Sequence, residues 1–218
     1  MRFISALSIT LLVAAQAAAA DGDYLSSIRL SLVALPDKGE VESTTTNTLT
    51  NVSVSSTESD TWTESAGRLS VGAFHNTGGT VAFNIGVGLN LSSFSATEDT
   101  YEQKLSEVGI FVEPGVSLNL YPQFSLELGV PLGVGSANYK ETDTGYSFEA
   151  SGGTYVEYGI VARPVGKFGR FQVYGEMGWL SNHASFSKSS VEGLPNVELE
   201  FNFTTKGAYY ALGAGIGF

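Results

Sequence analysis

The most regular pattern in the chain is an alternation of large apolar residues with small or polar ones, repeated in eight segments. It is cleanest in residues 81–92, where aliphatic or aromatic side chains occupy every second position and Ala, Asn, Gly or Ser the others. A period of two predicts a β-strand with one apolar face. The segments with this pattern are 24–35, 67–75, 81–92, 108–120, 124–135, 155–163, 170–185 and 204–218.

The connections between these segments alternate in length. Three are short turns, at 76–79, 121–123 and 165–169, and the other four are polar, at 36–65, 95–104, 139–153 and 187–200. We expect these four to be loops. Segment 36–65 could also be a hairpin extension, because Leu49, Val52 and Val54 give it some β character, and disorder is the other alternative. Eight strands of about 9–11 residues predict an all-β fold, an eight-stranded antiparallel up-and-down transmembrane β-barrel. A soluble β-sandwich is the alternative.

The first twenty residues have the pattern of an export signal. Arg2 precedes a mostly apolar run at 7–15, and small residues at 18–20 precede the polar Asp21. This pattern predicts a cleaved secretory signal peptide over 1–20 and a single barrel domain over 21–218. The chain has no cysteine, so we expect no disulfide or thiolate chemistry. Its formal net charge of −11 argues against nucleic acid as a partner.

The position of the charges predicts which face of each strand meets lipid. A charge on the lipid face near the middle of the bilayer costs about 2–4 kcal/mol, and the charges central to the strands fall on the small-residue face. That face is therefore expected to line the interior. Buried charges must be paired, so we predict a paired polar plug, with a narrow ion or solute channel as the alternative. The expected interior charges are Arg29, Arg68, Glu113, Glu127, Glu157, Arg163, Arg170 and Glu176.

The last strand ends the chain on an aromatic residue. Tyr210, Leu212, Ile216 and Phe218 lie on its apolar face. It resembles the closing strand of bacterial outer-membrane barrels, in which such a C-terminal pattern is the signal for the assembly machinery. The export signal, the eight strands and Phe218 together resemble the small OmpA/OmpX-type and opacity-type barrels.

That resemblance implies a location in the outer membrane of a Gram-negative bacterium, in contact with lipid and lipopolysaccharide. It also implies a monomer without cofactor or enzyme activity, which serves envelope integrity or surface contact through its loops. The partner of these loops is not encoded in a form that the sequence reveals. Aromatic residues near the expected membrane interfaces fit an aromatic girdle: Tyr24, Tyr121, Phe124, Phe171, Trp179 and Tyr210.

One short motif suggests a different function. His183 and Ser185 lie two residues apart, so they share a strand face, and Glu192 and Glu198 follow. A His-x-Ser motif with a later Glu resembles the site of the eight-stranded lipid A deacylase family (PagL-type). The resemblance implies Ser185 as nucleophile, His183 as base and a glutamate, Glu198 or Glu192, as its orienter. The alternative is a set of polar residues where a strand becomes a loop. We expect no metal site, because the chain's two histidines are far apart in sequence.

Overall fold

The computed structural model describes residues 25–35, 38–61, 65–144, 146–191 and 194–218. The expected signal peptide, Tyr24 and Glu192 lie outside these residues. None of the described residues forms a helix long and apolar enough to cross a membrane. The strands are β1 Leu25–Ala34, β2 Lys38–Asn47, β3 Val52–Thr61, β4 Ser65–Asn76, β5 Val81–Glu98, β6 Tyr101–Tyr121, β7 Phe124–Gly129, β8 Leu132–Asp143, β9 Tyr146–Phe168, β10 Phe171–Val191 and β11 Leu194–Gly217.

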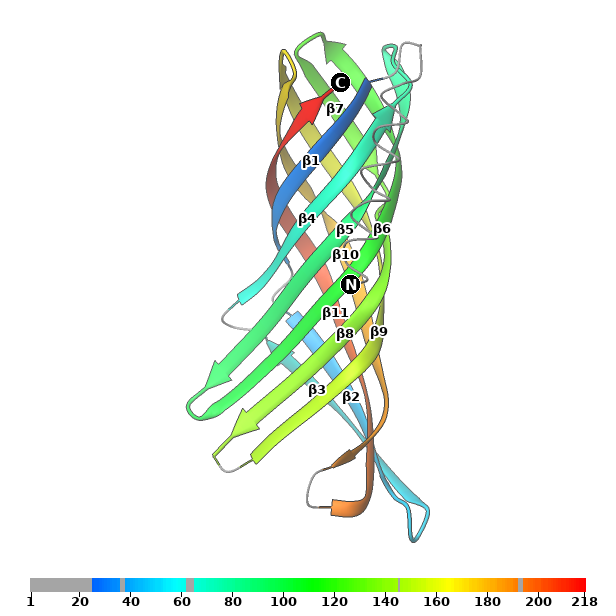
Figure 1. The fold of residues 1–218 in the computed structure, drawn as a ribbon, viewed down its shortest axis with the longest axis vertical. Coiled ribbons are helices and arrows are strands. Elements are labelled where there is room, and N and C mark those ends of the chain that lie inside the picture. The colour runs from blue at the N-terminus through cyan, green and yellow to red at the C-terminus, as the bar shows by residue number, and fades with distance from the viewer. Residues whose placement is uncertain (1–24, 36–37, 62–64, 145, 192–193) are drawn as a thin grey trace.

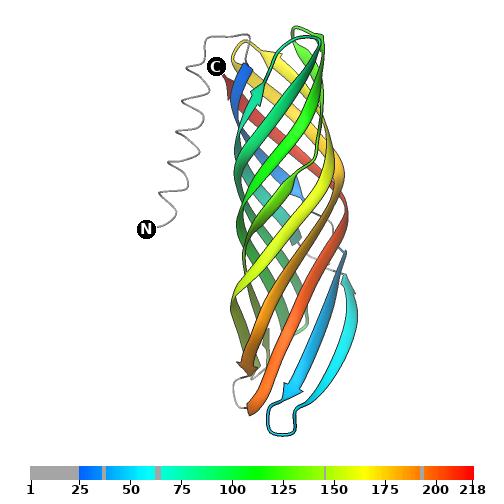
Figure 2. The ribbon, with the colours of Figure 1, turned by 90° about the vertical axis from the view of Figure 1, so that its right-hand side faces the viewer.

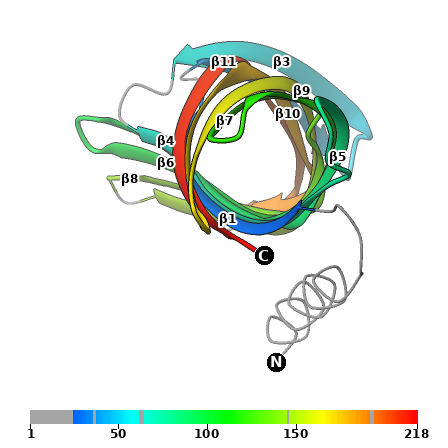
Figure 3. The ribbon, with the colours of Figure 1, turned by 90° about the horizontal axis from the view of Figure 1, so that it is seen from above.

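The strands close into an antiparallel ring. Its order is β1, β4, β5, β6, then β7 and β8 in one position, then β9, β10 and β11, and β11 pairs with β1 to close it. Figure 3 shows the ring from above. The closing register runs from Ser27 opposite Gly217 to Ala34 opposite Tyr210. The prediction of an eight-stranded antiparallel barrel is confirmed.

The expected strand 124–135 is divided in two by Pro131. β7 ends at Gly129 and β8 begins at Leu132, because proline has no N–H to give to the ladder. The wall stays closed across this break: the Val130 N–H donates to the Pro114 carbonyl at 2.9 Å, and the Gly159 N–H donates to the Pro131 carbonyl at 3.1 Å. β7 and β8 therefore act as one member of the ring.

The polar connections are β-hairpins, and the expectation of loops at 95–104, 139–153 and 187–200 is wrong. β5 and β6, β8 and β9, and β10 and β11 continue as paired strands well beyond the eight predicted segments. The expected segment 36–65 contains the hairpin β2–β3, which pairs with the first half of β11. Figures 1 and 2 show these hairpins at the end opposite the C-terminus, where they form an extension that we call the head.

The outer surface of the ring is apolar. Side chains such as Leu32, Phe83, Ile110 and Leu212 are between half and three quarters exposed, as expected of a face that meets lipid. All four expected assembly residues, Tyr210, Leu212, Ile216 and Phe218, point outward and are exposed. Exposed aromatic residues also gather at and near the short turns: Tyr121, Phe124, Phe168, Phe171 and Phe218.

Candidate functional site

The interior of the barrel holds a buried ion-pair network near the short turns. Arg29 of β1 donates from both terminal nitrogens to the two carboxylate oxygens of Glu127 on β7, at 2.6 and 2.7 Å. Both residues are buried. Such a bidentate pair is strong and fixes the geometry of both side chains.

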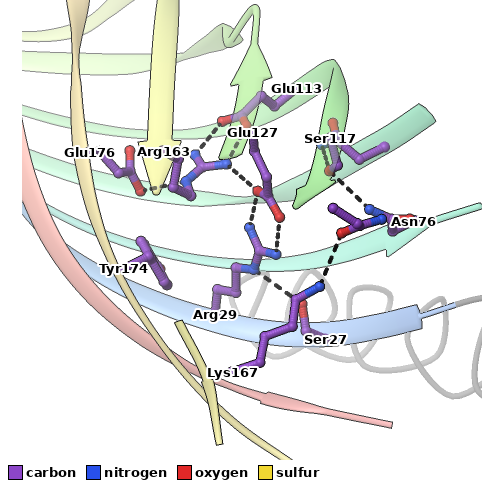
Figure 4. Close-up of polar contacts among 12 residues, drawn as sticks. Ser27, Arg29, Asn76, Glu113, Ser117, Glu127, Arg163, Lys167, Tyr174 and Glu176 are labelled. Atoms are coloured by element: carbon purple, nitrogen blue, oxygen red, sulfur yellow. Dashed lines mark hydrogen bonds and ion pairs between the residues drawn. The ribbon is translucent and has the colours of Figure 1, made fainter. Parts of the chain in front are cut away.

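Arg163 of β9 connects the rest of this network (Figure 4). It donates to both oxygens of Glu113 at 2.8 and 3.0 Å and to Glu127 at 3.2 Å. Its Nε lies 3.2 Å from a carboxylate oxygen of Glu176. One guanidinium group therefore links three strands of the ring, β6, β7 and β10, to its own.

Two aromatic rings enclose the two arginines. The guanidinium of Arg29 lies 4.5 Å from the ring centre of Phe74, and that of Arg163 lies 5.2 Å from it. Tyr174 lies 5.5 Å and 5.6 Å from the same two groups, and its hydroxyl donates to the Leu30 carbonyl at 3.0 Å. Stacking on rings suits the weakly hydrated guanidinium, so the network is packed as well as paired.

A second buried pair lies further toward the head. Arg68 of β4 donates to both carboxylate oxygens of Glu157 on β9, one of these bonds being 2.8 Å long, and its Nε donates to Ser92 at 2.9 Å. A cavity of about 40 Å³ lies between this pair and the network around Arg163. It is lined by Arg29, Glu113 and Arg163 among others. Such a volume has room for ordered water.

Two members of the interior were missed by sequence reasoning. Glu107 is 1% exposed, and the Asn182 amide donates to both of its oxygens at 2.7 Å. The expected strand 108–120 began after Glu107, and Asn182 lies within the expected strand 170–185 but was not assigned to the interior. The alternation was the available signal, because Glu107 shares its face with Glu113 on β6 and Asn182 shares its face with Glu176 on β10.

Arg170 does not belong to the interior. It lies exposed in the turn between β9 and β10, because the strand pattern ends at Phe168 and resumes at Phe171. The expected balance of four cations and four anions is therefore wrong. The described interior holds the guanidinium groups of Arg29, Arg68 and Arg163, and the partly buried ammonium group of Lys167 near the short turns (Figure 4). They stand against five carboxyl groups, those of Glu107, Glu113, Glu127, Glu157 and Glu176.

An aromatic core fills the barrel where it enters the head. Phe94 and Leu105 are at most 1% exposed, and Phe186 stacks on Phe201 with ring centres 4.5 Å apart. Tyr139 meets Phe201 edge-on at 5.0 Å. Their partners include Phe148 and Phe203. Tyr139 and Phe148 come from a segment expected to be a polar loop, and the others lie just beyond the ends of the expected strands. The interior is thus closed twice, by ion pairs in the barrel and by apolar packing at the head.

A serine–histidine pair lies on the outer wall at the base of the head. Ser185 Oγ lies 3.1 Å from His183 Nε2, and His183 Nδ1 lies 2.9 Å from Thr204 Oγ1 on β11. The side chain in contact with His183 Nδ1 is therefore that of Thr204. The expected role of Glu198 is wrong, because Glu198 lies six residues away from Thr204 on β11, opposite Ser190. No group of three or more acidic or histidine residues among those described has the arrangement of a metal site.

The exposed charges of the head are mostly acidic. Glu42, Asp99, Glu102, Asp143, Glu149 and Glu200 are exposed, against Lys104, Lys140 and Lys206. At the hairpin tips, Asp143 accepts hydrogen bonds from the Thr144 N–H at 2.6 Å and the Thr100 hydroxyl at 2.8 Å. These two bonds lower the pKa of the Asp143 carboxyl. The second bond joins the tip of β5–β6 to the tip of β8–β9.

No protein-family description matches this chain, and no curated protein sequence matches it. Solved structures with a similar fold include Ail, the attachment invasion locus protein of Yersinia pestis, at 14% identity over 90% of this chain and 99% of that one, with a TM-score of 0.44. OprG from Pseudomonas aeruginosa is 9% identical over 90% and 96%, with a TM-score of 0.45. Neisserial surface protein A is 12% identical over 90% and 98%, with a TM-score of 0.39.

What this chain shares with those proteins is the fold. Closed β-barrels satisfy every backbone group within a bilayer, and bacterial outer-membrane barrels combine an apolar outer band, aromatic residues at the interfaces and a polar interior. The chain has all three features and is a small β-barrel of the Gram-negative outer membrane.

Proposed function

We propose that this protein is a closed, non-enzymatic outer-membrane barrel whose acidic head makes contacts at the cell surface. The observation that carries the proposal is the double closure of the interior, by the network around Arg163 and by the aromatic core around Phe201. A barrel filled in this way offers no wide path for solutes. Its distinctive surface is then the head, and the short turns at one end with long connections at the other support a head that faces the outside of the cell.

The head is suited to surface contact because it is folded. Its hairpins are paired strands around buried aromatic residues such as Phe94, Phe201 and Phe203. A preformed surface loses little conformational entropy on binding. The excess of exposed carboxylates favours cationic partners, and the same carboxylates could meet the divalent cations that bridge lipopolysaccharide.

The test compares three strains: one lacking the protein, one carrying the full chain, and one carrying a chain in which the hairpins at 97–102 and 141–147 are shortened and the hairpin 38–61 is replaced by a two-residue turn. Adhesion to a positively charged surface should be lost in the first and third strains, and resistance to detergent measures envelope integrity separately. A trimmed chain that restores adhesion fully would contradict a role for the head. Purified protein in a planar bilayer should show no steady open-channel conductance, and a stable open pore would contradict the closed interior.

A second candidate function is hydrolysis of a lipid ester on the outer wall. It is supported by the contacts from Ser185 to His183 and from His183 to Thr204, the arrangement in which a base can take the proton of a nucleophile. A threonine in place of a carboxylate would orient His183 but would stabilise its charged form less. An apolar groove of about 620 Å³ lies further along β10, at Met177 and Trp179, where an acyl chain could rest.

Mass spectrometry of lipid A from cells with and without the protein tests this second function. A hydrolase would remove an acyl chain in the presence of the full protein but not of the Ser185→Ala variant. Labelling with a fluorophosphonate, which reacts with activated serines, gives an independent readout on purified protein. Identical lipid A in all strains and no labelling at Ser185 would exclude it.

A further inference from the structure

The hairpin β2–β3 ends the sheet on a free strand edge. β3 pairs with β2 along its whole length, from Thr61 opposite Lys38 to Val52 opposite Asn47. Among the described residues, no strand pairs with its other side. In Figure 2 β3 lies at the outside of the head, beyond β2. Ten residues of strand present about 33 Å of backbone with alternate N–H and carbonyl groups directed away from β2.

This edge is held in place. β2 pairs with β11 over nine positions, from Gly39 opposite Thr205 to Asn47 opposite Val197. The Thr48 N–H at its turn donates to the Asn196 carbonyl at 2.9 Å, and Val41 packs against the aromatic core. The hairpin is therefore an extension of the barrel sheet, and a strand that added to β3 would meet a preformed template.

β3 has few of the devices that usually protect a free edge. Natural edges are blocked by charged side chains, especially lysine, by proline, by a bulge or by a short strand length. β3 has ten residues with no Lys, Arg or Pro and an uninterrupted register with β2, and its two charged residues, Glu58 and Asp60, would repel a second copy of this chain but not a cationic strand. Its side chains from Val52 to Thr57 are all exposed. Most are small hydroxyl side chains, which leave room for a neighbouring strand, and Val52 and Val54 add exposed apolar surface.

The charge around this edge indicates which kind of strand could bind there. Glu40 and Glu42 stand on the adjacent strand, opposite positions 59 and 57 of β3. The sequence of β3 itself contributes Glu58 and Asp60, and the hairpin 38–61 contains a single cationic residue, Lys38. A second copy of this chain would bring the same carboxylates to the interface, whereas an extended segment rich in Lys or Arg would place opposite charges across the strand pair.

From these observations we infer that the free edge of β3 binds an extended, positively charged peptide segment, which adds to the sheet as a further strand. Backbone hydrogen bonds supply the pairing, as in other cases of strand addition, and the carboxylates around the hairpin supply the preference for cations. The inference rests on the proposed surface-contact function and specifies the site and the class of partner.

The test uses the full mature barrel in lipid nanodiscs and a ten-residue peptide in which Lys alternates with Thr and Val. A control peptide has the same charge but Pro at two central positions, which removes N–H donors from the ladder. Binding is measured by calorimetry at low and high salt, and hydrogen exchange reports the protection of β3 amides.

Two protein variants separate pairing from charge. In one, Glu40→Gln and Glu42→Gln remove carboxylates while leaving the edge. In the other, the hairpin 38–61 is replaced by a two-residue turn, which is feasible because the Leu35 N–H donates to the Ala66 carbonyl at 3.0 Å and so holds the two ends together. The Lys peptide should protect β3 amides and bind the glutamine variant several-fold more weakly. The affinity of the Lys peptide for the hairpin-deleted protein, and that of the Pro peptide for the full barrel, should each be lower by roughly tenfold or more, since several ladder hydrogen bonds are lost.

Three results would overturn the inference. Equal binding of the Lys and Pro peptides without protection of β3 would show general attraction to an acidic head, which leaves the proposed surface contact intact but removes the strand site. Protection of β3 that rises with protein concentration in the absence of peptide would show self-pairing instead. An absence of peptide binding in a protein whose head still supports adhesion would place the contact elsewhere on the head.

Discussion

Arg163 is the residue whose replacement should most damage the barrel, and the Arg163→Met substitution measures this. Methionine keeps a long side chain between Phe74 and Tyr174 but removes the charge. Glu127 retains its two bonds from Arg29 at 2.6 and 2.7 Å. Glu113 loses both of its bonds from Arg163, and Glu176 loses its contact at 3.2 Å.

The expected loss follows from those contacts. Removing one partner of a buried ion pair costs about 3–5 kcal/mol, because the remaining charge is left uncompensated. Here Glu113 is 5% exposed, and the side chain of Glu176 is 9% exposed. A loss of this size changes the unfolding equilibrium by roughly two to three and a half orders of magnitude. Adding Glu113→Gln to Arg163→Met should restore at least about 1 kcal/mol of the free energy of unfolding, because it removes the uncompensated charge and the effects of substitutions at contacting residues are not additive.

The assay is reversible urea unfolding of the barrel in phospholipid vesicles, followed by tryptophan fluorescence. Arg170→Met is the matched control, since Arg170 lies exposed in the β9–β10 turn, and it should change the free energy of unfolding by less than about 0.5 kcal/mol. If Arg163→Met costs under about 1 kcal/mol, or no more than the control, the network does not stabilise the barrel as described.

Three further predictions concern other parts of the molecule. Gly86→Ala should destabilise the barrel by about 1–3 kcal/mol in the same assay, because the new methyl group would overlap the ring of Phe74; a neutral result would contradict the tight packing. Phe201→Ala should cost about 3–5 kcal/mol and should speed hydrogen exchange in the head more than in the membrane strands; uniform acceleration would show that the head has no core of its own. Carbon-13 titration should place the pKa of Asp143 below its usual range of about 4, and Thr100→Val should raise it. The hydrogen bond from Thr100 to the Asp143 carboxylate is thus expected to be fully present above about pH 4 and to be lost as the pH falls through the lowered pKa of Asp143.

The ring of strands could be predicted because two constraints act on every residue in it. A spanning strand needs an apolar face, and its charges must avoid lipid, so alternation and charge placement agree along 81–92 and its neighbours. The same constraints place Arg29, Glu113 and Glu157 inside. They do not act in the turn at Arg170, where solvent accepts a charge, and there the sequence-based assignment failed.

The head could not be predicted in the same way. Its outward residues face water, so charges and hydroxyl groups interrupt the apolar pattern, and single aromatic residues such as Phe94, Phe148 and Phe201 carry the inward face. The residues that face each other across neighbouring strands could not be predicted either. The shared face of His183 and Ser185 followed from their spacing, but the contact with Thr204 depends on the register of β10 with β11.

The continuity of β11 determines how the molecule would bear mechanical load. This strand has 24 residues, about 80 Å of chain at strand spacing, and it runs from the tip of the head to the opposite mouth of the ring. A pull on the β2–β3 hairpin along its length would be transmitted through its ladder with β11 directly to the strand that closes the ring. That ladder would be loaded in shear, with many hydrogen bonds resisting at once rather than opening one by one. If a cell were attached through this hairpin under flow, the force would therefore pass through the β2–β11 ladder directly into the membrane-embedded part of β11.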